Sequence, residues 1–163
     1  MTTIGILSDT HINRSSKEFR KSCADAFSGC DAIIHAGDLT NIAILSVFGG
    51  KDIYAVSGNM CDFATKQSLS DSRTLVINGF SVAICHGAGS KHNIEDRLLD
   101  RFPETDCIVY GHTHIPICHT YCDTLFLNPG SFHGTGQYGA PGTYGLLRID
   151  SDGLHGSIHE LKS

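Results

Sequence analysis

Short apolar runs alternate with helical segments through the first third of the chain. Three runs have the length of strands, and the two segments between them have the pattern of helices: 3–8, 32–36 and 53–56 for the strands, 15–28 and 41–48 for the helices. Glycine follows each helical segment, at Gly29 and Gly49. This β-α-β-α-β order predicts a parallel sheet with right-handed crossover connections.

The second half of the chain has a different pattern, in which strands follow one another across tight turns. Asn78-Gly79 separates the apolar runs 74–77 and 80–84 and is a strong hairpin signal. Also predicted are a helix at 93–102, a strand at 108–110 and two more hairpins: 117–121 with 124–127, and 144–149 with 155–161. The 163 residues are predicted to form one α/β domain, 1–163, with two packed mixed sheets flanked by helices.

Composition and charge argue against several classes of protein. Apolar residues make up 40% of the chain and charged residues 18%, which favours a folded core over long disorder. The formal net charge is -5 and Lys and Arg form no run, so general nucleic-acid binding is not expected. No apolar stretch approaches the length of a membrane span. The odd count of 7 cysteines and the lack of a signal-peptide pattern predict reduced thiols and a cytoplasmic location.

Polar side chains that can bind metals follow the ends of five predicted strands, usually beside a glycine. The donors are Asp9, His11, Asp38, Asn59, His86, His112 and His114. We expect them to converge, because ligands bind off the carboxyl ends of strands in α/β sheets and glycines permit sharp turns. Carboxylate, imidazole and amide donors without thiolates suit Mn, Fe or Zn. The donors outnumber the needs of one ion, so the sequence predicts two divalent ions that share one carboxylate.

Each motif taken alone is weak, because Asp-x-His and Gly-Asp are common in surface loops and turns. Their order favours a metal site, since each follows a strand and successive motifs are about one strand-helix or hairpin unit apart. His35 lies on the strand before Asp38 and is interpreted as a packing or supporting residue. Arg14 and His133 lie near the predicted site in sequence. Each is expected either to lie on the surface or to contact the substrate, and the sequence does not decide between these two roles.

The combined motif set resembles that of the calcineurin-like metallophosphoesterases. The set is Asp9-x-His11, Gly37-Asp38, Gly58-Asn59, His86-Gly87 and Gly111-His112-Thr113-His114. Asn128-Pro129-Gly130-Ser131 adds a likeness to the small single-domain phosphodiesterases of bacteria and archaea. The resemblance implies a four-layer α/β/β/α sandwich. It also implies that Asp38 bridges two ions, one bound by Asp9, His11 and His114 and the other by Asn59, His86 and His112.

The function that this resemblance implies is a metal-dependent phosphoesterase. More specifically, it predicts a phosphodiesterase that hydrolyses small phosphodiesters with a hydroxide bridging two divalent metals, with catalytic roles for Asp38, Asn59 and His112. Mn²⁺ is the expected metal, and Ni²⁺, Fe²⁺ or Zn²⁺ are alternatives. Two other functions stay open: a phosphomonoesterase or nucleotidase at the same site, and a non-catalytic protein-binding scaffold like the retromer subunit with this fold. The complete donor set favours the enzyme, and a homo-oligomer stays open.

The sequence departs from the family pattern after Asn59. Related phosphomonoesterases have a histidine there that can protonate the leaving oxygen, whereas this chain has Met60. It also carries one residue more before Asp62 than small relatives do, which leaves open whether Cys61, Asp62 or His133 takes part in catalysis. Diesters with good leaving groups are therefore predicted to be better substrates than alkyl monoesters.

Overall fold

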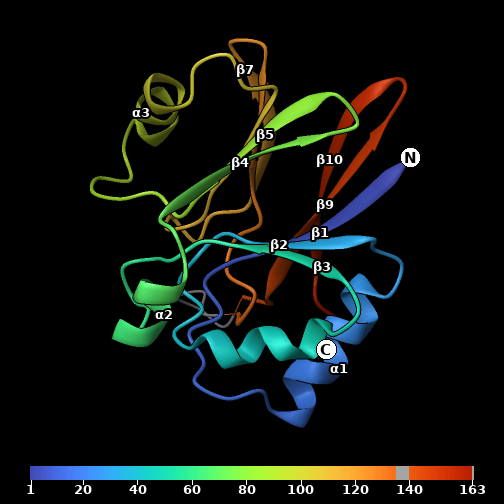
Figure 1. The fold of residues 1–163 in the computed structure, drawn as a ribbon, viewed down its shortest axis with the longest axis vertical. Coiled ribbons are helices and arrows are strands. Elements are labelled where there is room, and N and C mark those ends of the chain that lie inside the picture. Colours follow the sequence, from blue (N-terminus) through green and yellow to red (C-terminus); the bar gives the residue numbers. More distant parts are fainter. Residues whose placement is uncertain (135–139, 163) are drawn as a thin grey trace.

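Two five-stranded sheets form the centre of the protein (Figure 1). The computed structural model describes residues 1–134 and 140–162. The first sheet has the order β10-β9-β1-β2-β3. Its strands are β1 (Thr2–Leu7), β2 (Ala32–His35), β3 (Asp52–Ala55), β9 (Thr143–Asp150) and β10 (Gly153–Glu160). β1, β2 and β3 run parallel, as the β-α-β-α-β pattern predicts, and β9 pairs antiparallel with β1.

The second sheet has the order β4-β5-β6-β8-β7. Its strands are β4 (Ser72–Ile77), β5 (Phe80–Cys85), β6 (Cys107–Val109), β7 (Ile117–Tyr121) and β8 (Thr124–Asn128). β5, β6 and β8 are parallel neighbours, while β4 and β7 pair antiparallel at the two edges. Both sheets are therefore mixed, and the three predicted hairpins are confirmed.

Helices α1 (Lys17–Phe27) and η1 (Ile42–Phe48) cover the outer face of the first sheet. Ser16 caps α1 by accepting a hydrogen bond from the Phe19 backbone N–H at 3.0 Å. The buried residues of α1 recur at helical spacing, which places Phe19, Cys23 and Phe27 against the sheet. The segment predicted as a helix at 41–48 is a 3₁₀ helix, a type that the sequence pattern did not distinguish.

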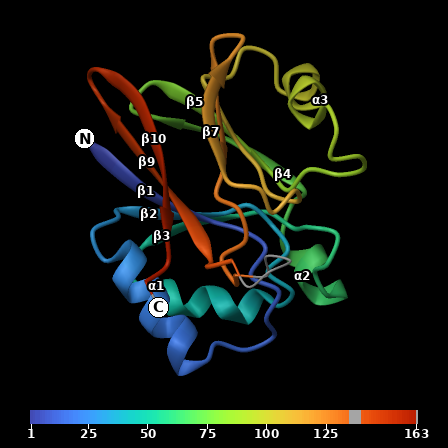
Figure 2. The same cartoon turned by 180° about the vertical axis from the view of Figure 1, so that it is seen from behind.

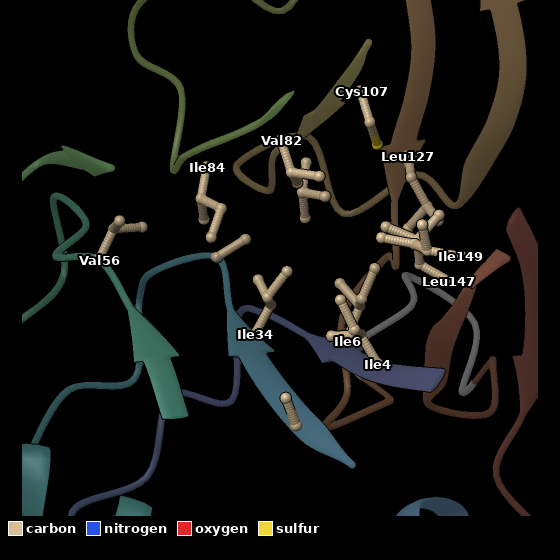
Figure 3. Close-up of a cluster of buried hydrophobic side chains, with 13 residues drawn as sticks. Ile4, Ile6, Ile34, Val56, Val82, Ile84, Cys107, Leu127, Leu147 and Ile149 are labelled. Carbon is tan, nitrogen blue, oxygen red and sulfur yellow. The ribbon is translucent and has the colours of Figure 1, made fainter. Parts of the chain in front are cut away.

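The core between the two sheets follows from the alternation of side chains along the strands. Ile4 and Ile6 of β1 point toward the second sheet, where they meet side chains such as Val82 and Leu127 (Figure 3). All four are fully buried. Burial of this kind contributes roughly 1.5–3 kcal/mol for each large aliphatic side chain. The sheets are therefore bound face to face by apolar contacts.

Helix α3 (Ile94–Arg101) covers the outer face of the second sheet. Its Ile94 and Leu98 pack against Tyr110 and Phe126. The layers are thus α1 with η1, the first sheet, the second sheet and α3, as Figure 2 also shows. The predicted four-layer α/β/β/α sandwich is confirmed, whereas the assignment of 1–163 to one domain stays a prediction.

Helix α2 (Phe63–Ser68) was not predicted from the sequence. It is six residues long and buries only Thr65, so it has no apolar stripe that a periodicity search could detect. Within residues 1–134 and 140–162, no helix has the length and apolar composition needed to cross a membrane.

Candidate metal centre

The carboxyl ends of four strands meet at one end of the two sheets. Asp9 follows β1, Asp38 follows β2, His86 follows β5 and Gly111 follows β6. Backbone hydrogen bonds join these strand ends within each sheet. The Asp9 N–H donates to the Gly37 carbonyl at 3.0 Å, and the Gly111 N–H donates to the His86 carbonyl at 3.0 Å. Donors that are distant in the sequence therefore lie side by side.

Three imidazoles converge on one carboxylate oxygen, Oδ1 of Asp9. The Nε2 atom of His114 lies 3.0 Å from it, that of His11 3.7 Å and that of His86 3.9 Å. His86 Nε2 also lies 3.1 Å from Oδ2 of Asp38. The Asp9 side chain is fully buried, whereas the side chains of His11 and His114 are 25% and 36% exposed. The cluster therefore extends from the interior to the solvent.

These donors fit the requirements of a divalent cation. Two groups have ligand atoms within 4.8 Å of one another: Asp9 with His11 and His114, and Asp9 with Asp38 and His86. In the part of the chain that is described, Asp9 Oδ1, His11 Nε2 and His86 Nε2 are buried without a hydrogen-bond partner. A buried polar atom without a partner costs about 1–3 kcal/mol. Three such atoms at one place are accounted for if they bind a cation, and their chemistry suits Mn, Fe or Zn.

Five of the expected donors have a left-handed backbone conformation. The φ angle is 53° at Asp9, 49° at His11, 54° at Asp38, 67° at His112 and 62° at His114. Such a conformation costs a residue other than glycine roughly 1–3 kcal/mol and is concentrated at functional sites. Its occurrence at five of the seven expected donors supports a functional site at this place.

Gly111 permits the close approach of the two sheets at the centre. A Cβ atom at this position would lie 2.7 Å from Ser8 Oγ and 2.8 Å from Asp9 Oδ2, closer than side chains pack. Because glycine has no Cβ atom, the backbone N–H of His112 can donate to Asp9 Oδ2 at 3.3 Å. The glycine before the His-x-His pair is therefore required by the contact with Asp9.

His112 lies outside the two compact groups of imidazoles and carboxylates. Asn59 is exposed in the turn after β3, and its carbonyl accepts a hydrogen bond from Lys66 Nζ at 2.8 Å. The His112 ring lies 5.5 Å from the His86 ring, and its Nε2 lies 2.9 Å from the Gly89 carbonyl. A carbonyl only accepts, so Nε2 carries the proton and Nδ1 is the atom of His112 left to bind a ligand.

Polar side chains beside the donors fix their positions. Ser8 Oγ donates to Asp9 Oδ2, and Ser131 Oγ donates to the Asp9 carbonyl at 3.0 Å. Asn128 Nδ2 donates to the Gly111 carbonyl at 2.9 Å. Asn128 and Ser131 belong to the Asn-Pro-Gly-Ser stretch, but sequence reasoning missed Ser8. Its place directly before Asp9 was the available signal.

His35 supports the loop between Asp9 and His11. Its Nε2 lies 3.1 Å from Thr10 Oγ1, and the residue is fully buried. Burial lowers the pKa of His35 to about 3, so the ring is neutral at ordinary pH. His35 belongs to neither of the two donor groups.

The carboxylates and imidazoles shift one another's protonation. Burial by itself would raise the pKa of Asp9, but the adjacent imidazoles of His11 and His114 bring it below its ordinary value. Burial would also raise the pKa of Asp38, but the adjacent His86 ring lowers it overall. The adjacent carboxylate of Asp9 raises the pKa of His11. Burial would lower the pKa of His86, but Asp38 and Asp9 raise it.

We expect metal to stabilise the protein more strongly as pH rises from about 5 to 8. Protons compete with metal for His11 and His86, and their raised pKa values extend this competition above pH 6.5. With a chelator the trend should reverse. The charged imidazoles then contribute stability that is complete below pH 6.5 and lost as pH rises through the raised pKa values. Melting temperatures with chelator and with Mn²⁺ test this, and parallel curves would contradict it.

Cys61 and Asp62 are both occupied in holding the loop after Asn59. Cys61 is buried in the core beneath the first sheet, and its Sγ accepts a hydrogen bond from the Gly58 N–H at 3.3 Å. Asp62 caps α2: its Oδ1 accepts from the Thr65 N–H at 2.8 Å, and its Oδ2 accepts from Asn41 Nδ2 at 2.8 Å. This Asp-x-x-Thr cap was the sequence signal for α2. Both side chains therefore have structural partners in the loop and in α2.

Asp62→Ala should lower the free energy of unfolding, because the cap of α2 is lost. Asp62→Asn keeps an oxygen that can accept the same bond, so its stability and hydrolytic activity should stay near those of the wild type. Chemical denaturation and hydrolysis assays on both variants check this. A stable Asp62→Asn protein without activity would show that the carboxylate takes part in the chemistry.

Arg14 and His133 lie together in a second hollow beside the centre. Both line a cavity of about 350 Å³ that Thr10 and Phe132 also line. Thr10 stands between Asp9 and His11 in the chain, so this cavity adjoins the metal centre on the side of α1. Both residues are exposed, which is compatible with either reading of their role.

Comparison with known proteins gives one matching family and several relatives. Residues 2–152 match the calcineurin-like phosphoesterase superfamily domain. The chain is 37% identical over 134 residues to a probable metallophosphoesterase of Methanocaldococcus jannaschii, covering 78% of this chain and 67% of the relative. It is 34% identical over 160 residues to a probable metallophosphoesterase of Methanothermobacter thermautotrophicus, covering 95% of this chain and 90% of the relative. A phosphodiesterase of Methanocaldococcus jannaschii is 26% identical over 146 residues, covering 80% and 84%.

Solved structures share the fold. A predicted phosphoesterase of Streptococcus pneumoniae has a TM-score of 0.75 at 23% identity, covering 99% of this chain and 92% of that one. Vacuolar protein sorting 29 of Cryptosporidium parvum has a TM-score of 0.72 at 18% identity, covering 99% and 98%. With the family match over residues 2–152 and the archaeal relatives, these findings show that the chain belongs to the calcineurin-like phosphoesterase superfamily.

Proposed function

We propose that the protein is a phosphodiesterase that hydrolyses small phosphodiesters with two divalent ions, Mn²⁺ being the native metal. One observation carries the proposal: Asp9 Oδ1, His11 Nε2 and His86 Nε2 are buried together without hydrogen-bond partners among the described residues. Relatives named metallophosphoesterase and phosphodiesterase support ester hydrolysis. The proposal takes residues 1–163 as one domain that acts on a small phosphate ester in the cytoplasm.

We assign the ligands as the family resemblance implies. One ion is bound by Asp9, His11, Asp38 and His114, and the other by Asp38, Asn59, His86 and His112. Asp38 is the shared ligand in this assignment, whereas the two compact groups share Asp9. Both carboxylates are nearly or fully buried at the centre, and both belong to the group with His86, so either would be available as the shared ligand.

Neighbouring residues would fix the positions of the metal-binding side chains and leave one side of the metal centre open to solvent. Paired divalent ions lower the pKa of a water between them and polarise phosphoryl oxygens during in-line attack. Asp9 and Asp38 supply the charge that retains such ions, and the contact with Gly89 orients His112. Asn59 is exposed beside the centre, and we assign its amide N–H to a phosphoryl oxygen. The partly exposed rings of His11 and His114 mark the side from which substrate approaches.

The protein-binding scaffold is the alternative with the same fold. Vacuolar protein sorting 29 shares the architecture, but at 18% identity the likeness concerns the fold alone. A scaffold gains nothing from unpaired buried donors or from left-handed backbone at Asp9, Asp38 and His114, because both reduce stability. These features favour the enzyme.

Metal analysis followed by a hydrolysis screen tests the proposed function. Protein supplied with Mn²⁺, Ni²⁺, Fe²⁺ or Zn²⁺ should bind about two ions per chain and cleave bis(p-nitrophenyl) phosphate. Faster cleavage of p-nitrophenyl phosphate or of a nucleoside monophosphate would favour the phosphomonoesterase. A folded protein that takes up no metal and cleaves no ester would favour the scaffold.

A further inference from the structure

A cavity of about 450 Å³ lies between α3 and β7 on the outer face of the second sheet. We call it the α3–β7 pocket. Ile117, His119 and Tyr121 alternate along β7 and line one wall, while Glu95 and Asp96 of α3 line the other. Figures 1 and 2 show α3 beside the β7–β8 hairpin from both sides. The volume lies within the range of small-molecule sites, about 300–1,000 Å³.

The α3–β7 pocket shares a wall with the metal centre. Thr113 lines the pocket and stands between His112 and His114 in the chain. Lys91, on the opposite rim, reaches the Thr113 carbonyl with its Nζ at 3.4 Å. The same loop provides the Gly89 carbonyl that holds His112. The pocket therefore adjoins the loop that carries His112 and His114.

The terminal polar atoms of the ring side chains that line the pocket form hydrogen bonds with the carboxylates of α3. Tyr110 Oη and His119 Nε2 each lie 2.9 Å from a carboxylate oxygen of Glu95. Tyr121 Oη donates to Asp96 Oδ1 at 2.9 Å. These bonds hold the rings of His119 and Tyr121 in fixed positions. Ring and aliphatic surface is therefore what the pocket mainly offers to a ligand.

Apolar side chains at the pocket are exposed where a ligand would cover them. The Tyr121 side chain is 41% exposed and that of Ile115, beside His114, is 56% exposed. Ile115 and Ile117 run from the rim of the metal centre toward Tyr121. A flat ring gains more from such a surface than a small alkyl group does, because it buries more area and contacts the tyrosine ring.

We propose that the α3–β7 pocket binds a planar aromatic group of the phosphodiester substrate, an aryl ring or a nucleobase. The placement of the phosphoryl group at the metal centre rests on the proposed function. Tyr121 and Ile117 are then specificity-determining residues, and Ile115 covers the ligand at the entrance. Attachment of α3 to the sheet is a separate role, carried by Ile94 and Leu98.

Three p-nitrophenyl diesters with the same leaving group test the preference: the methyl, phenyl and thymidine 5′-phosphate esters. The KM of the phenyl or thymidine ester should be about tenfold lower than that of the methyl ester. The ester with the lower KM identifies the source of the ring. Equal KM values for all three esters would overturn the proposal.

Substitutions of Tyr121 separate the ring from its hydroxyl. Tyr121→Ala should abolish most of the KM difference, whereas Tyr121→Phe keeps the ring and should retain it. Val76→Ala, at an apolar residue on β4 that is 75% exposed and does not line the pocket, is the matched control and should change nothing. A KM difference that survives Tyr121→Ala would overturn the proposal.

A binding measurement without catalysis separates this inference from the proposed function. Thymidine and phenol are titrated into chelator-treated protein while backbone amide NMR signals are followed. Signals of residues 94–96 and 117–121 should shift in the wild type and in Tyr121→Phe, and much less in Tyr121→Ala. Shifts without hydrolysis of any ester would refute the phosphodiesterase and leave the pocket standing. Hydrolysis without shifts would refute the pocket alone.

Discussion

Asp38→Asn should lower hydrolysis by at least about 100-fold and reduce metal content at both positions, since loss of outer partners of a ligand alone costs 10–100-fold. The carboxylate lies 3.1 Å from His86 Nε2 and accepts the Met60 N–H at 2.7 Å. Asparagine keeps an oxygen for the Met60 N–H but lacks the charge that retains a divalent cation. The fold should survive because the substitution preserves shape. Metal analysis and kcat/KM measure the effect.

Asp9→Asn is the matched substitution that identifies the shared ligand. If Asp38 bridges the ions, Asp9→Asn should mainly remove one of them, while Asp38→Asn removes both. The reverse result would assign the shared role to Asp9, on whose Oδ1 three imidazoles converge. Melting temperatures with chelator show whether each variant is folded. An Asp38→Asn protein with two ions and normal turnover would refute its role as a ligand.

The wild type should cleave aryl phosphodiesters faster than alkyl phosphomonoesters, and Met60→His should shift this preference toward monoesters. The Met60 backbone adjoins Asp38, and its side chain is 58% exposed beside the centre. Methionine has no proton to donate, and Cys61 and Asp62 are occupied elsewhere. An imidazole at position 60 could protonate the leaving oxygen. General acid catalysis is worth about 10²–10⁴-fold, so even partial rescue is measurable.

Two controls accompany this substitution. Met60→Leu changes the side chain without supplying a proton donor and should leave the preference unchanged. Phe63→His places an imidazole on the first residue of α2, where the native side chain is 76% exposed, and should not rescue monoesters. A wild type that prefers alkyl monoesters would show that another acid already acts, with His133 the next residue to substitute.

Much of the fold was predictable because local patterns determine it. Strands β1, β2 and β3 follow from apolar runs separated by helical segments, and a parallel pair needs such a crossover. Asn78-Gly79 specified the β4–β5 hairpin because both residues tolerate positive φ, which is 51° and 88° here. The pattern of elements was compatible with two packed sheets flanked by helices, and the family resemblance specified the order of the four layers.

Two features of the secondary structure were not predicted from the sequence, and each has a physical cause. The segment at 42–48 is a 3₁₀ helix, and an apolar pattern does not reveal which backbone hydrogen bonds form. Helix α2 is short and mostly exposed, so its sequence has no periodicity, and its cap at Asp62 was the one local signal.

The sequence by itself determined the kinds of donor and their places after strands, because strand ends and glycines are local features. Only the tertiary structure decided which donors meet. Asp9 Oδ1 became the centre of three imidazoles because hydrogen bonds between the two sheets bring the ends of β1, β2, β5 and β6 together. These bonds run from His86 Nδ1 to the Ala36 carbonyl and from the His112 N–H to Asp9 Oδ2. The sequence did not predict the roles of Cys61 and Asp62 or the α3–β7 pocket either. Each depends on contacts between segments far apart in the chain. Distances across such contacts are set by packing, which no local pattern encodes.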